Sequence, residues 1–525
     1  MLFRSLYRFE VATARVTLLT DGRSRNTGGI WSRTGNAFAY SSTRRNGRDT
    51  DLYVMDPARP ESNRMVAEVK GGGWTVADWS PDETTLAVLQ SVSINESHLH
   101  LLDLKSGRMT PLTPAGQTGV AWGNARFSRD GTQIYARTDH NSEVHRIVQI
   151  DRSSGALQVL SPELRWDVDA FDPSPDGQRI AFLANEDGAS VLHLLDVGTQ
   201  REIPLPQLAL GVITGLQWHP LGTELGFSLS SATSPADAWS LDVAAGRLTR
   251  WTESETGGLD ATSFRTPERV RVKSFDGLEV SGFMYRPDAK KHPGPRPVII
   301  SIHGGPESQS RPTFLGRNNY YLDQLGVALL YPNVRGSSGY GKTFLTLDNG
   351  RKREDSVRDI GAFIDWIGRR PEFDTNRIAV MGGSYGGYMT LASLVHFGSR
   401  LKAGVDVVGI SSFVTFLENT QDYRRDLRRV EYGDERDPGM REFLNDISPL
   451  GRVDRIRSPL LVIQGKNDPR VPVTEAEQLV SAIRQQGGVS WYLMAKDEGH
   501  GFAKKRNADF QFWSTVLFLE AFLLK

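Results

Sequence analysis

The first half of the chain contains short apolar runs, each of which follows a turn of polar residues. The run Thr85 to Leu89 follows Ser-Pro-Asp-Glu, and the run Arg179 to Leu183 follows Ser-Pro-Asp-Gly. Pro, Asp and Gly favour tight turns, and apolar runs of this length fit β-strands. A strand that ends in Asp, a Gly turn and a last strand come next, as in Leu99 to Arg108. The pattern therefore predicts units of four strands joined by tight turns.

These units repeat at a nearly fixed period. Their first positions are spaced by 48, 48, 46 and 45 residues, and these positions are Trp31, Trp79, Phe127, Pro173 and Trp218. A period in the forties with strand-like content is typical of propeller blades. The segment from Leu6 to Thr20 lines up with Leu99 to Thr113, which form only the last part of a unit. The sequence predicts an incomplete N-terminal β-propeller over residues 1–262, with TolB/WD40-like repeats that amount to about five and a half blades.

The half blade at the start has two interpretations. A strand from elsewhere in the chain could complete it, or the chain could lack an N-terminal part. The absence of an obvious spare strand after Thr252 favours the second interpretation. The segment from Met1 to Ser5 has neither an apolar core nor a small-residue cleavage site, so no signal peptide is recognised. A cytoplasmic location is the expectation, and a lost signal peptide stays open as the alternative.

The pattern changes after about Thr262. Continuous apolar runs replace the blade units, and each is typical of a strand buried on both faces. Between them, Val357, Ile360, Ile364 and Ile367 recur at three- and four-residue steps, which predicts an amphipathic helix. The apolar runs include residues 297–302, 327–331, 378–381 and 460–463. Strand–helix alternation of this kind predicts a doubly wound, mostly parallel sheet over residues 263–525.

Composition and charge exclude several classes of protein. The 62 basic and 62 acidic residues give no net charge, which argues against a nucleic-acid binder. The chain has no Cys, so disulfides, thiolate catalysis and Cys-based metal sites are excluded. No run of about 18 apolar residues is present, so we expect no membrane-spanning helix. A hydrophobic content of 39% is enough for a folded core.

A glycine-rich motif, Gly382 to Gly387, follows the predicted strand 378–381 and precedes a helical pattern over 388–396. It has the form G-x-S-x-G in the strand–turn–helix context of a nucleophile elbow. The plainer alternative is a glycine-rich turn with an incidental Ser. In an elbow, Ser384 is the nucleophile, and the domain is an α/β-hydrolase. A serine hydroxyl is a weak nucleophile and needs a base that is held by a carboxylate.

The base is expected after the nucleophile in chain order. Only His396 and His500 follow Ser384. His396 lies on the helix that leaves the elbow and points away from the site, which indicates a structural role. His500 lies in a loop after the predicted strand 489–494, between two glycines that free the loop to present the imidazole. His500 is therefore the predicted base.

The acid is expected at a strand end between these two residues. Asp468 directly follows the predicted strand 460–463 and is the preferred candidate. Asp446 and Asp454 are rivals, but they belong to helical or linking segments. Asp497 is very close to His500 in sequence, which makes it a poor residue to orient the imidazole.

An oxyanion hole needs two backbone N–H donors. The first is expected from Tyr385, the residue after the nucleophile, and the second from the loop after the third strand. That loop contains Gly305, the favoured donor, and Gly304 as its rival. His303 precedes Ser384 in the chain, and we expect it to shape this loop by hydrogen bonding.

Together these motifs resemble the prolyl oligopeptidase family of serine peptidases, and most closely its acylaminoacyl-peptidase and dipeptidyl-aminopeptidase-like branch. The resemblance rests on residues 382–388, 467–472 and 497–502, and also on residues 303–306 and 333–341. It implies an N-terminal β-propeller that restricts entry of folded proteins and a C-terminal α/β-hydrolase domain that cleaves short peptides. It covers nearly the whole chain.

The resemblance also implies substrate-binding residues. Arg470 matches the arginine that binds a substrate carbonyl near the cleaved bond, with an ordinary surface charge as the alternative. Phe413 and Phe416 match the apolar segment that lines the S1 pocket, although aromatic residues there are otherwise ordinary core residues. Paired propeller glutamates that hold a free N-terminus are not evident, because Glu-Glu does not occur before residue 260.

The sequence therefore predicts a serine peptidase that hydrolyses short peptides, of acylaminoacyl or oligopeptidase type, through a Ser384–Asp468–His500 triad and an acyl-enzyme. A carboxylesterase with the same triad and a dipeptidyl aminopeptidase are alternatives, and the intact triad argues against an inert propeller scaffold. We expect no metal or organic cofactor and no nucleic-acid or membrane partner. The substrates are short peptides, and a homo-oligomer stays open.

Overall fold

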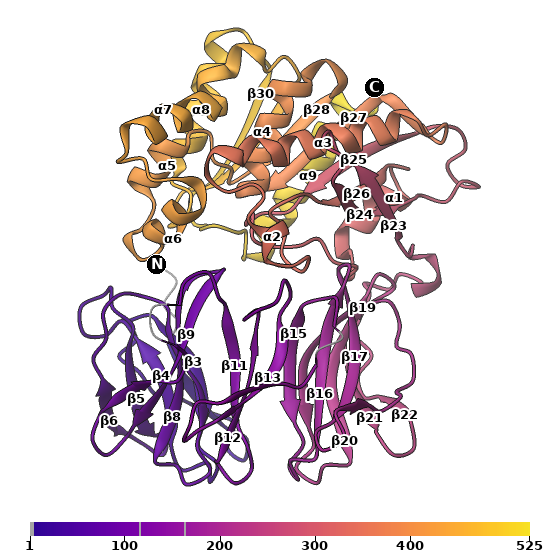
Figure 1. The fold of residues 1–525 in the computed structure, drawn as a ribbon. Coiled ribbons are helices and arrows are strands. Elements are labelled where there is room, and N and C mark those ends of the chain that lie inside the picture. The colour runs from indigo at the N-terminus through magenta and orange to yellow at the C-terminus, as the bar shows by residue number, and fades with distance from the viewer. Residues whose placement is uncertain (1–4, 115–116, 162–163) are drawn as a thin grey trace.

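The computed structural model describes residues 5–114, 117–161 and 164–525. The chain folds into two parts, a ring of small antiparallel sheets and a larger sheet covered by helices (Figure 1). The first four residues of the predicted propeller range lie outside the described residues. The predicted boundary at 262/263 falls between the last strand of the small sheets, which ends at Arg250, and the first strand of the larger sheet, which begins at Glu268.

The small sheets match the predicted blades. The described residues form five four-stranded sheets and one two-stranded sheet, and the two-stranded sheet lies where the half blade was predicted. The predicted N-terminal β-propeller is confirmed. The strands are β1 (Tyr7–Glu10), β2 (Arg15–Leu18), β3 (Asn26–Trp31), β4 (Phe38–Ser42), β5 (Asp51–Asp56), β6 (Arg59–Ala67), β7 (Trp74–Trp79), β8 (Thr85–Ser93), β9 (Glu96–Asp103), β10 (Met109–Pro111), β11 (Trp122–Phe127), β12 (Gln133–Thr138), β13 (Arg146–Asp151), β14 (Leu157–Val159), β15 (Val168–Pro173), β16 (Arg179–Glu186), β17 (Ala189–Asp196), β18 (Arg201–Glu202), β19 (Gly211–Trp218), β20 (Glu224–Ser231), β21 (Ser234–Asp242) and β22 (Arg247–Arg250).

Side chains of the repeated motif build the turn between the first two strands of a blade. In the blade that begins with β7, the Ser80 hydroxyl donates to Asp82 at 2.5 Å and accepts the backbone N–H of Thr85 at 3.0 Å. The same pair of bonds recurs at Ser128 and at Ser174. These local bonds explain why the Ser and Asp positions repeat with the blades.

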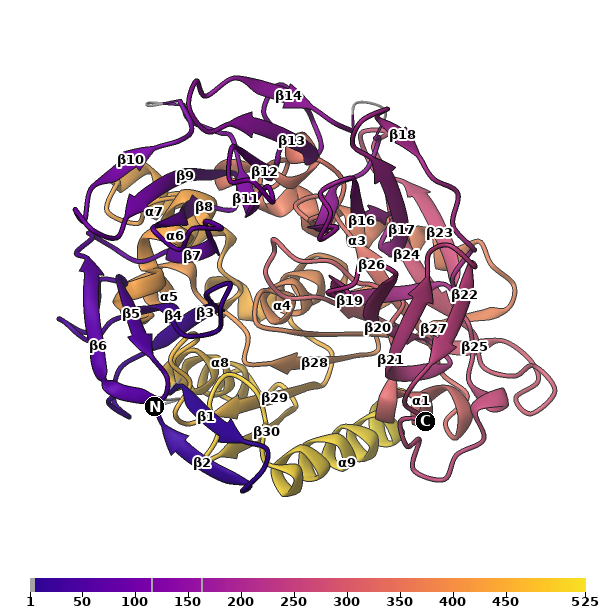
Figure 2. The same cartoon turned by 90° about the horizontal axis from the view of Figure 1, so that it is seen from below.

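Two of the repeated Trp residues join neighbouring blades. The indole N–H of Trp79 donates to the carbonyl of Ile30 at 3.0 Å, and that of Trp218 donates to the carbonyl of Asp172 at 3.0 Å. The blades follow one another around a ring, from β1–β2 to β19–β22, as Figure 2 shows in the view from below. In that view helix α4 (Tyr385–Phe397) lies behind the centre of the ring.

The second part is one eight-stranded sheet in the order β23-β24-β26-β25-β27-β28-β29-β30. The pairs from β26 to β30 are parallel, and β23 and β24 pair antiparallel. The predicted mostly parallel sheet is confirmed. Its strands are β23 (Glu268–Lys273), β24 (Glu279–Tyr285), β25 (Arg296–Ile302), β26 (Ala328–Asn333), β27 (Phe373–Gly383), β28 (Ala403–Val407), β29 (Leu460–Gly465) and β30 (Ser490–Ala495).

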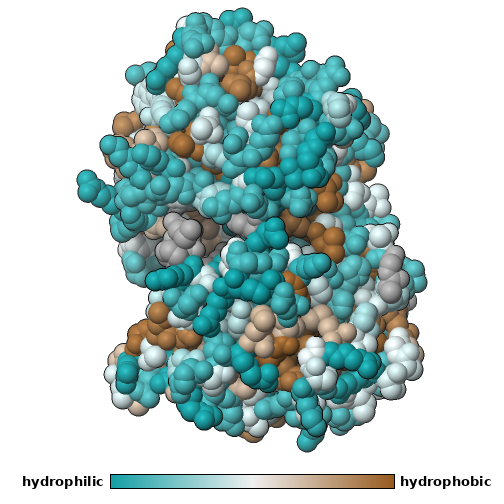
Figure 3. All heavy atoms as spheres, turned by 90° about the vertical axis from the view of Figure 1, so that its left-hand side faces the viewer, coloured by the Kyte–Doolittle hydropathy of each residue, from teal (hydrophilic) through white to brown (hydrophobic). Residues whose placement is uncertain are grey.

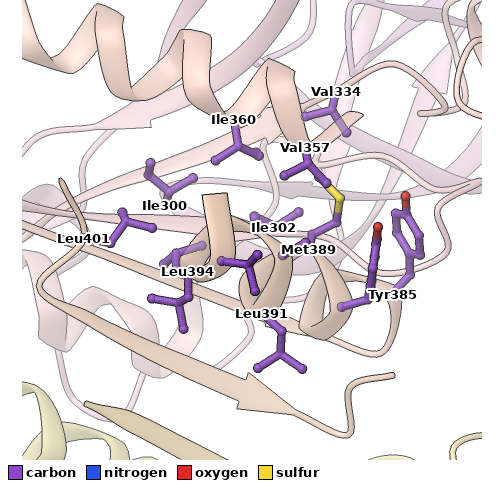
Figure 4. Close-up of a cluster of buried hydrophobic side chains, with 14 of the residues drawn as sticks. Ile300, Ile302, Val334, Val357, Ile360, Tyr385, Met389, Leu391, Leu394 and Leu401 are labelled. Atoms are coloured by element: carbon purple, nitrogen blue, oxygen red, sulfur yellow. The ribbon is translucent and has the colours of Figure 1, made fainter. Parts of the chain in front are cut away.

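Helices cover both faces of this sheet, because the buried strands are apolar on both sides. Ile300 and Ile302 pack against α3 and α4 in one core, whereas Ile299 packs against α1 and α9 in the other. Figure 4 shows the first of these cores around Met389. The helices are α1 (Asn319–Asp323), α2 (Lys342–Leu345), α3 (Arg353–Gly368), α4, α5 (Phe413–Asn419), α6 (Asp422–Tyr432), α7 (Pro438–Ile447), α8 (Val473–Gln485) and α9 (Lys505–Phe522), with the 3-10 helices η1 (Ala261–Ser263), η2 (Gly316–Asn318), η3 (Gly350–Lys352), η4 (Gly398–Arg400) and η5 (Pro449–Arg455).

The two parts contact each other through charged and polar side chains. Arg311 donates to Asp169 at 2.7 Å and to the carbonyl of Gly188 at 2.8 Å. Arg271 pairs with Asp187 at 3.0 Å. Helix α6 contacts strand β8 of another blade. The face that carries α5 to α8 is mainly hydrophilic, with hydrophobic residues in small scattered groups (Figure 3). Among the described helices, none has the length and apolar character needed to cross a bilayer.

Candidate active site

Ser384 lies in the sharp turn between β27 and α4. Its backbone has φ 60° and ψ −119°, a conformation that a residue with a side chain adopts only under strain. A strand must reverse into a helix within one residue at this point, which forces that conformation and exposes the hydroxyl at the tip of the turn. The predicted nucleophile elbow therefore has the expected backbone geometry.

Three glycines of the elbow are required by close backbone contacts, and one of them is Gly387, where a Cβ would lie 2.5 Å from the Cα of Gly409. A Cβ on Gly386 would lie 2.2 Å from the carbonyl oxygen of Ile302, and one on Gly382 would lie 2.3 Å from the carbonyl oxygen of Gly386. Gly383 differs, because its nearest neighbour would be the carbonyl oxygen of Val407 at 3.7 Å. Gly382, Gly386 and Gly387 therefore have no room for a side chain, whereas Gly383 does.

His500 and Asp468 lie in hydrogen-bond contact. His500 Nδ1 is 2.7 Å from Asp468 Oδ2. The other carboxylate oxygen, Oδ1, accepts the backbone N–H groups of Arg470 at 2.8 Å and Val471 at 3.0 Å. A carboxylate only accepts, so Nδ1 carries the proton and Nε2 is left as the basic nitrogen. The Asp468 side chain is fully buried, whereas the His500 side chain is 16% exposed and open to a substrate.

The other candidates for acid and base have different surroundings. Asp446 and Asp454 are exposed on α7 and η5. Asp497 pairs with Lys504 and accepts from an asparagine of α9. His396 Nε2 lies 2.8 Å from a carboxylate oxygen of Glu354 on α3, in line with the structural role expected for it. These contacts leave Asp468 as the carboxylate that orients His500.

The three predicted triad residues follow strands of one parallel run. Ser384 follows β27, Asp468 follows β29 and His500 follows β30, and these strands share the order β27-β28-β29-β30. The carboxyl ends of parallel strands meet at one edge of a sheet, so the topology brings the three loops to the same edge.

The predicted oxyanion loop runs beside the nucleophile. A Cβ on Gly304 would lie 3.3 Å from the Ser384 Cβ. Tyr385 is the first residue of α4, so its N–H has no acceptor within the helix. Gly305 has φ 131°, and a Cβ there would lie 2.6 Å from the backbone nitrogen of Glu307. The loop that contains the predicted donor Gly305 thus reaches Ser384 at Gly304, and the other predicted donor, Tyr385, directly follows Ser384.

His303 holds this loop, as expected from the sequence. Its Nδ1 donates to the carbonyl of Gly304 at 2.9 Å, and its Nε2 lies 2.9 Å from the Ser337 hydroxyl. Burial lowers the pKa of the His303 imidazole, which favours the neutral form with one donating nitrogen. Because the Gly304–Gly305 peptide is planar and trans, holding the Gly304 carbonyl points the Gly305 N–H in the opposite direction.

The predicted substrate-binding residues have contrasting environments. The Arg470 side chain is exposed and has no hydrogen-bond or ion-pair partner among the described residues, so it can reach a ligand. Phe413 and Phe416, on α5, are fully buried and pack against Tyr432. That packing is typical of core residues, and their role in an S1 pocket stays a prediction.

Two further acids of this domain, Asp406 and Glu475, are buried. Asp406 lies on β28, the neighbour of the elbow strand β27 in the sheet. Burial raises the pKa of its carboxyl group to about 7. Burial also raises the pKa of Glu475, although Ser411 and Ser412 donate backbone N–H groups to it. In the part of the chain that the structure describes, no three His, Asp or Glu side chains are grouped closely enough to hold a metal ion.

Two contacts of the oxyanion loop were missed by the sequence analysis. Arg428 and Tyr432, both on α6, donate to the carbonyl of Gly305. No motif marks them, because α6 is a charged helix far from Gly305 in sequence. Four arginines among residues 424–429 were the only local signal.

Comparisons with known proteins identify the family of both domains. Residues 18–254 match the prolyl oligopeptidase N-terminal β-propeller domain, and residues 312–524 match the prolyl oligopeptidase family. Dipeptidyl aminopeptidase BIII of Pseudoxanthomonas mexicana is 25% identical over 87% of this chain and 81% of its own length. Dipeptidyl peptidase family member 6 of Caenorhabditis elegans is 34% identical over 43% of this chain and 31% of its own length. The acylamino-acid-releasing enzyme of Mus musculus is 23% identical over 49% of this chain and 35% of its own length.

Solved structures share the whole fold. A puromycin-hydrolyzing peptidase of Mycobacterium tuberculosis superposes with a TM-score of 0.89 at 20% identity, covering 99% of this chain and 83% of that one. A puromycin hydrolase gives a TM-score of 0.86 at 21% identity, covering 96% of this chain and 80% of that one. From the two matching domains and the relatives, the chain belongs to the prolyl oligopeptidase family, a family of serine-type hydrolases that act on peptide bonds.

Proposed function

We propose that this chain cleaves short peptides by acyl transfer, with Ser384 as nucleophile, His500 as base and Asp468 as the acid that orients the base. The observation that carries this proposal is the 2.7 Å contact between His500 Nδ1 and the buried Asp468 carboxylate. It leaves Nε2 free to act on a hydroxyl, and the strained elbow presents such a hydroxyl at the same sheet edge.

In the proposed reaction, His500 Nε2 takes the proton from the Ser384 hydroxyl while Oγ attacks the substrate carbonyl carbon. The carbonyl oxygen becomes an oxyanion, which the N–H groups of Tyr385 and Gly305 stabilise. The imidazolium then gives its proton to the leaving amine, and the carbon–nitrogen bond breaks. Water attacks the acyl-enzyme with His500 again as base, which releases the acid product and restores Ser384. Asp468 stabilises the imidazolium in both halves.

Acylated or internal peptides are the proposed substrates, rather than peptides held by a free N-terminus. Carboxylates of the propeller that reach the other domain would be the groups to bind a substrate ammonium. Each of them already accepts a hydrogen bond from the hydrolase domain. They are Glu143, Asp167, Asp169 and Asp187. Redirecting them to a substrate would break these hydrogen bonds between the domains and would leave the buried N–H of Gly341 without its acceptor, which is costly.

A dipeptidyl aminopeptidase is the second candidate, since the relative that aligns with 87% of this chain carries that name. Turnover of acyl-peptide anilides, free dipeptidyl anilides and p-nitrophenyl esters distinguishes the activities. Preference for the acylated anilide supports the proposal, preference for the free dipeptide supports the second candidate, and turnover of esters alone indicates a carboxylesterase.

The triad is tested by labelling with a fluorophosphonate probe. Wild-type protein is expected to be labelled at one serine, and Ser384→Ala is expected to abolish both labelling and turnover. Labelling that persists at one site in Ser384→Ala would refute the assignment of the nucleophile. Ser393→Ala is a matched control, because Ser393 lies buried on the same helix α4 and is expected to leave labelling unchanged.

A further inference from the structure

The carbonyl of Gly305 is held from outside its loop. Arg428 Nη1 donates to this oxygen at 3.1 Å, and the Tyr432 hydroxyl donates to it at 3.1 Å. Both donors come from α6, more than 120 residues further along the chain. The two side-chain donors can occupy both lone pairs of this carbonyl oxygen, so its position is fixed from two directions.

Gly305 is held on both sides as a result. His303 fixes the Gly304 carbonyl and with it the Gly305 N–H, while Arg428 and Tyr432 fix the carbonyl of Gly305 itself. Glycine has no Cβ, so its backbone is less restricted than that of other residues. Without these contacts, the N–H assigned to the oxyanion hole could swing away from the attacking Ser384. An oxyanion donor is effective only when it is aligned before the reaction.

The side chain of Tyr385, whose N–H is the other oxyanion donor, joins the same group of residues. Its ring lies 6.0 Å from that of Tyr432, nearly parallel to it. The Arg353 guanidinium lies 5.3 Å from the Tyr385 ring and 4.9 Å from the Tyr432 ring. Arg353 also donates to the backbone carbonyl of Glu431 at 2.8 Å, which holds the last turn of α6.

Carboxylates fix the orientation of Arg428. Its Nη1 donates to Glu307 at 3.0 Å and to Glu431 at 2.8 Å, in addition to the Gly305 carbonyl. Glu307 follows the oxyanion loop directly, so the loop is tied to α6 through a side chain as well as through its backbone. Charge-assisted bonds of this kind are stronger than neutral ones and restrict the guanidinium to one position.

Aromatic packing fixes Tyr432. Its side chain is 1% exposed and contacts Phe413 at 5.1 Å and Phe416 at 6.1 Å between ring centroids. The two phenylalanines expected at the S1 pocket thus support the tyrosine that holds the Gly305 carbonyl. A buried hydroxyl in such a cluster is costly unless it donates, and Gly305 is its acceptor.

We infer that Arg428 and Tyr432 are positioning residues for the oxyanion hole, and that they act by fixing the Gly305 peptide beside Ser384. This inference rests on the proposed function of the same site.

The test compares Tyr432→Phe with Tyr388→Phe. Tyr388 lies in the same aromatic cluster, 5.4 Å from the Tyr385 ring, and its buried hydroxyl has no hydrogen-bond partner among the described residues. The readouts are kcat, KM and the inhibition constant of a peptide aldehyde, which adds to Ser384 and forms an alkoxide in the oxyanion hole. Thermal unfolding of both variants reports on folding.

We expect Tyr432→Phe to lower kcat about 10-fold, part of the roughly 10²- to 10³-fold that loss of a whole oxyanion donor costs. The aldehyde is expected to bind more weakly by the same factor, while KM stays within about 2-fold. Tyr388→Phe is expected to leave all three values within about 2-fold. Arg428→Met is expected to lower kcat further, and Arg428→Lys to restore part of it.

If Tyr432→Phe matches Tyr388→Phe in all three values, the inference is wrong. It is also wrong if kcat falls with no change in aldehyde binding, because the effect would then be structural. If the wild-type protein turns over substrate and Ser384→Ala does not, the proposed function holds, and this result does not depend on the behaviour of Tyr432→Phe. A wild-type protein that neither turns over substrate nor binds the aldehyde would remove the proposed function and this inference together.

Discussion

Replacing Asp468 by Asn changes one atom of the triad and tests the role of the acid directly. The two backbone N–H groups of Arg470 and Val471 both point at Oδ1, at 2.8 and 3.0 Å. They require an acceptor there, so the Asn amide is expected to place its oxygen at the Oδ1 position. Its NH₂ group then occupies the Oδ2 position, 2.7 Å from His500 Nδ1.

This orientation reverses the hydrogen bond to the base. The amide NH₂ donates, so Nδ1 of His500 must accept and the imidazole proton moves to Nε2. An Nε2 that already carries a proton cannot take the proton of Ser384. Reversal of the tautomer in a Ser-His-Asp triad lowers kcat about 10⁴-fold, which corresponds to about 5 kcal/mol of transition-state stabilisation. The fold is expected to persist, because the buried side chain keeps its size and both backbone bonds.

The assay is steady-state turnover of the best anilide substrate, with thermal unfolding as a measure of folding. Asp497→Asn is the matched control, because Asp497 lies in the His500 loop and bonds Lys504 and Asn507 instead of the imidazole. Its kcat is expected to stay within about 2-fold of the wild-type value. If Asp468→Asn retained a tenth of wild-type kcat, or if Asp497→Asn were the more damaged variant, the assignment of the acid would be refuted.

Three other predictions follow from the site. Gly386→Ala is expected to lower the midpoint of thermal unfolding strongly, because the new Cβ would lie 2.2 Å from a carbonyl oxygen. Gly383→Ala has room for a Cβ and is expected to change the midpoint little. Equal decreases of the midpoint in both variants would contradict the packing argument. Arg470→Ala is expected to lower kcat/KM for peptides about 10-fold through a charge-assisted contact with the substrate, with no change in unfolding, and an unchanged kcat/KM would indicate a surface charge only. Asp406 has a pKa raised to about 7 in the folded protein, so its contribution to stability is complete below pH 4, its unfolded value, and is lost as the pH rises through about 7. Asp406→Asn is therefore expected to stabilise the protein at pH 8 and not at pH 4, and a stability difference that does not vary with pH would refute this.

Local chemistry made the propeller predictable. The Ser and Asp of each repeat bond to each other and to the next strand within a few residues, so the motif marks each turn wherever the blade lies in the ring. The half blade was equally visible, because β1 and β2 carry the pattern of β9 and β10. The elbow was recognisable for a similar reason. Gly382 and Gly386 are required because a Cβ would collide with backbone atoms of the strand–helix turn itself or of the adjoining strand.

Helices α5, α6 and α7 had no such local signal. They lie between β28 and β29, and their sequences carry no motif and no simple apolar stripe that the sequence analysis used. The environment of Phe413 and Phe416 was also undetermined, because an apolar side chain suits a pocket wall as well as a core. The tertiary structure alone shows that both rings pack against Tyr432.

The sequence by itself therefore determined the order of the domains, the repeating blades, the nucleophile elbow and the chain order of Ser384, Asp468 and His500. Each of these depends on bonds between neighbours in sequence or on the geometry of one turn. The tertiary structure alone decided which side chains hold Gly305, and it brought Asp468, the candidate preferred from the sequence, into contact with His500. Those contacts join residues from 32 to 127 positions apart. No local pattern encodes such pairs, because they form only when the sheet brings its strand ends together and α6 packs beside them.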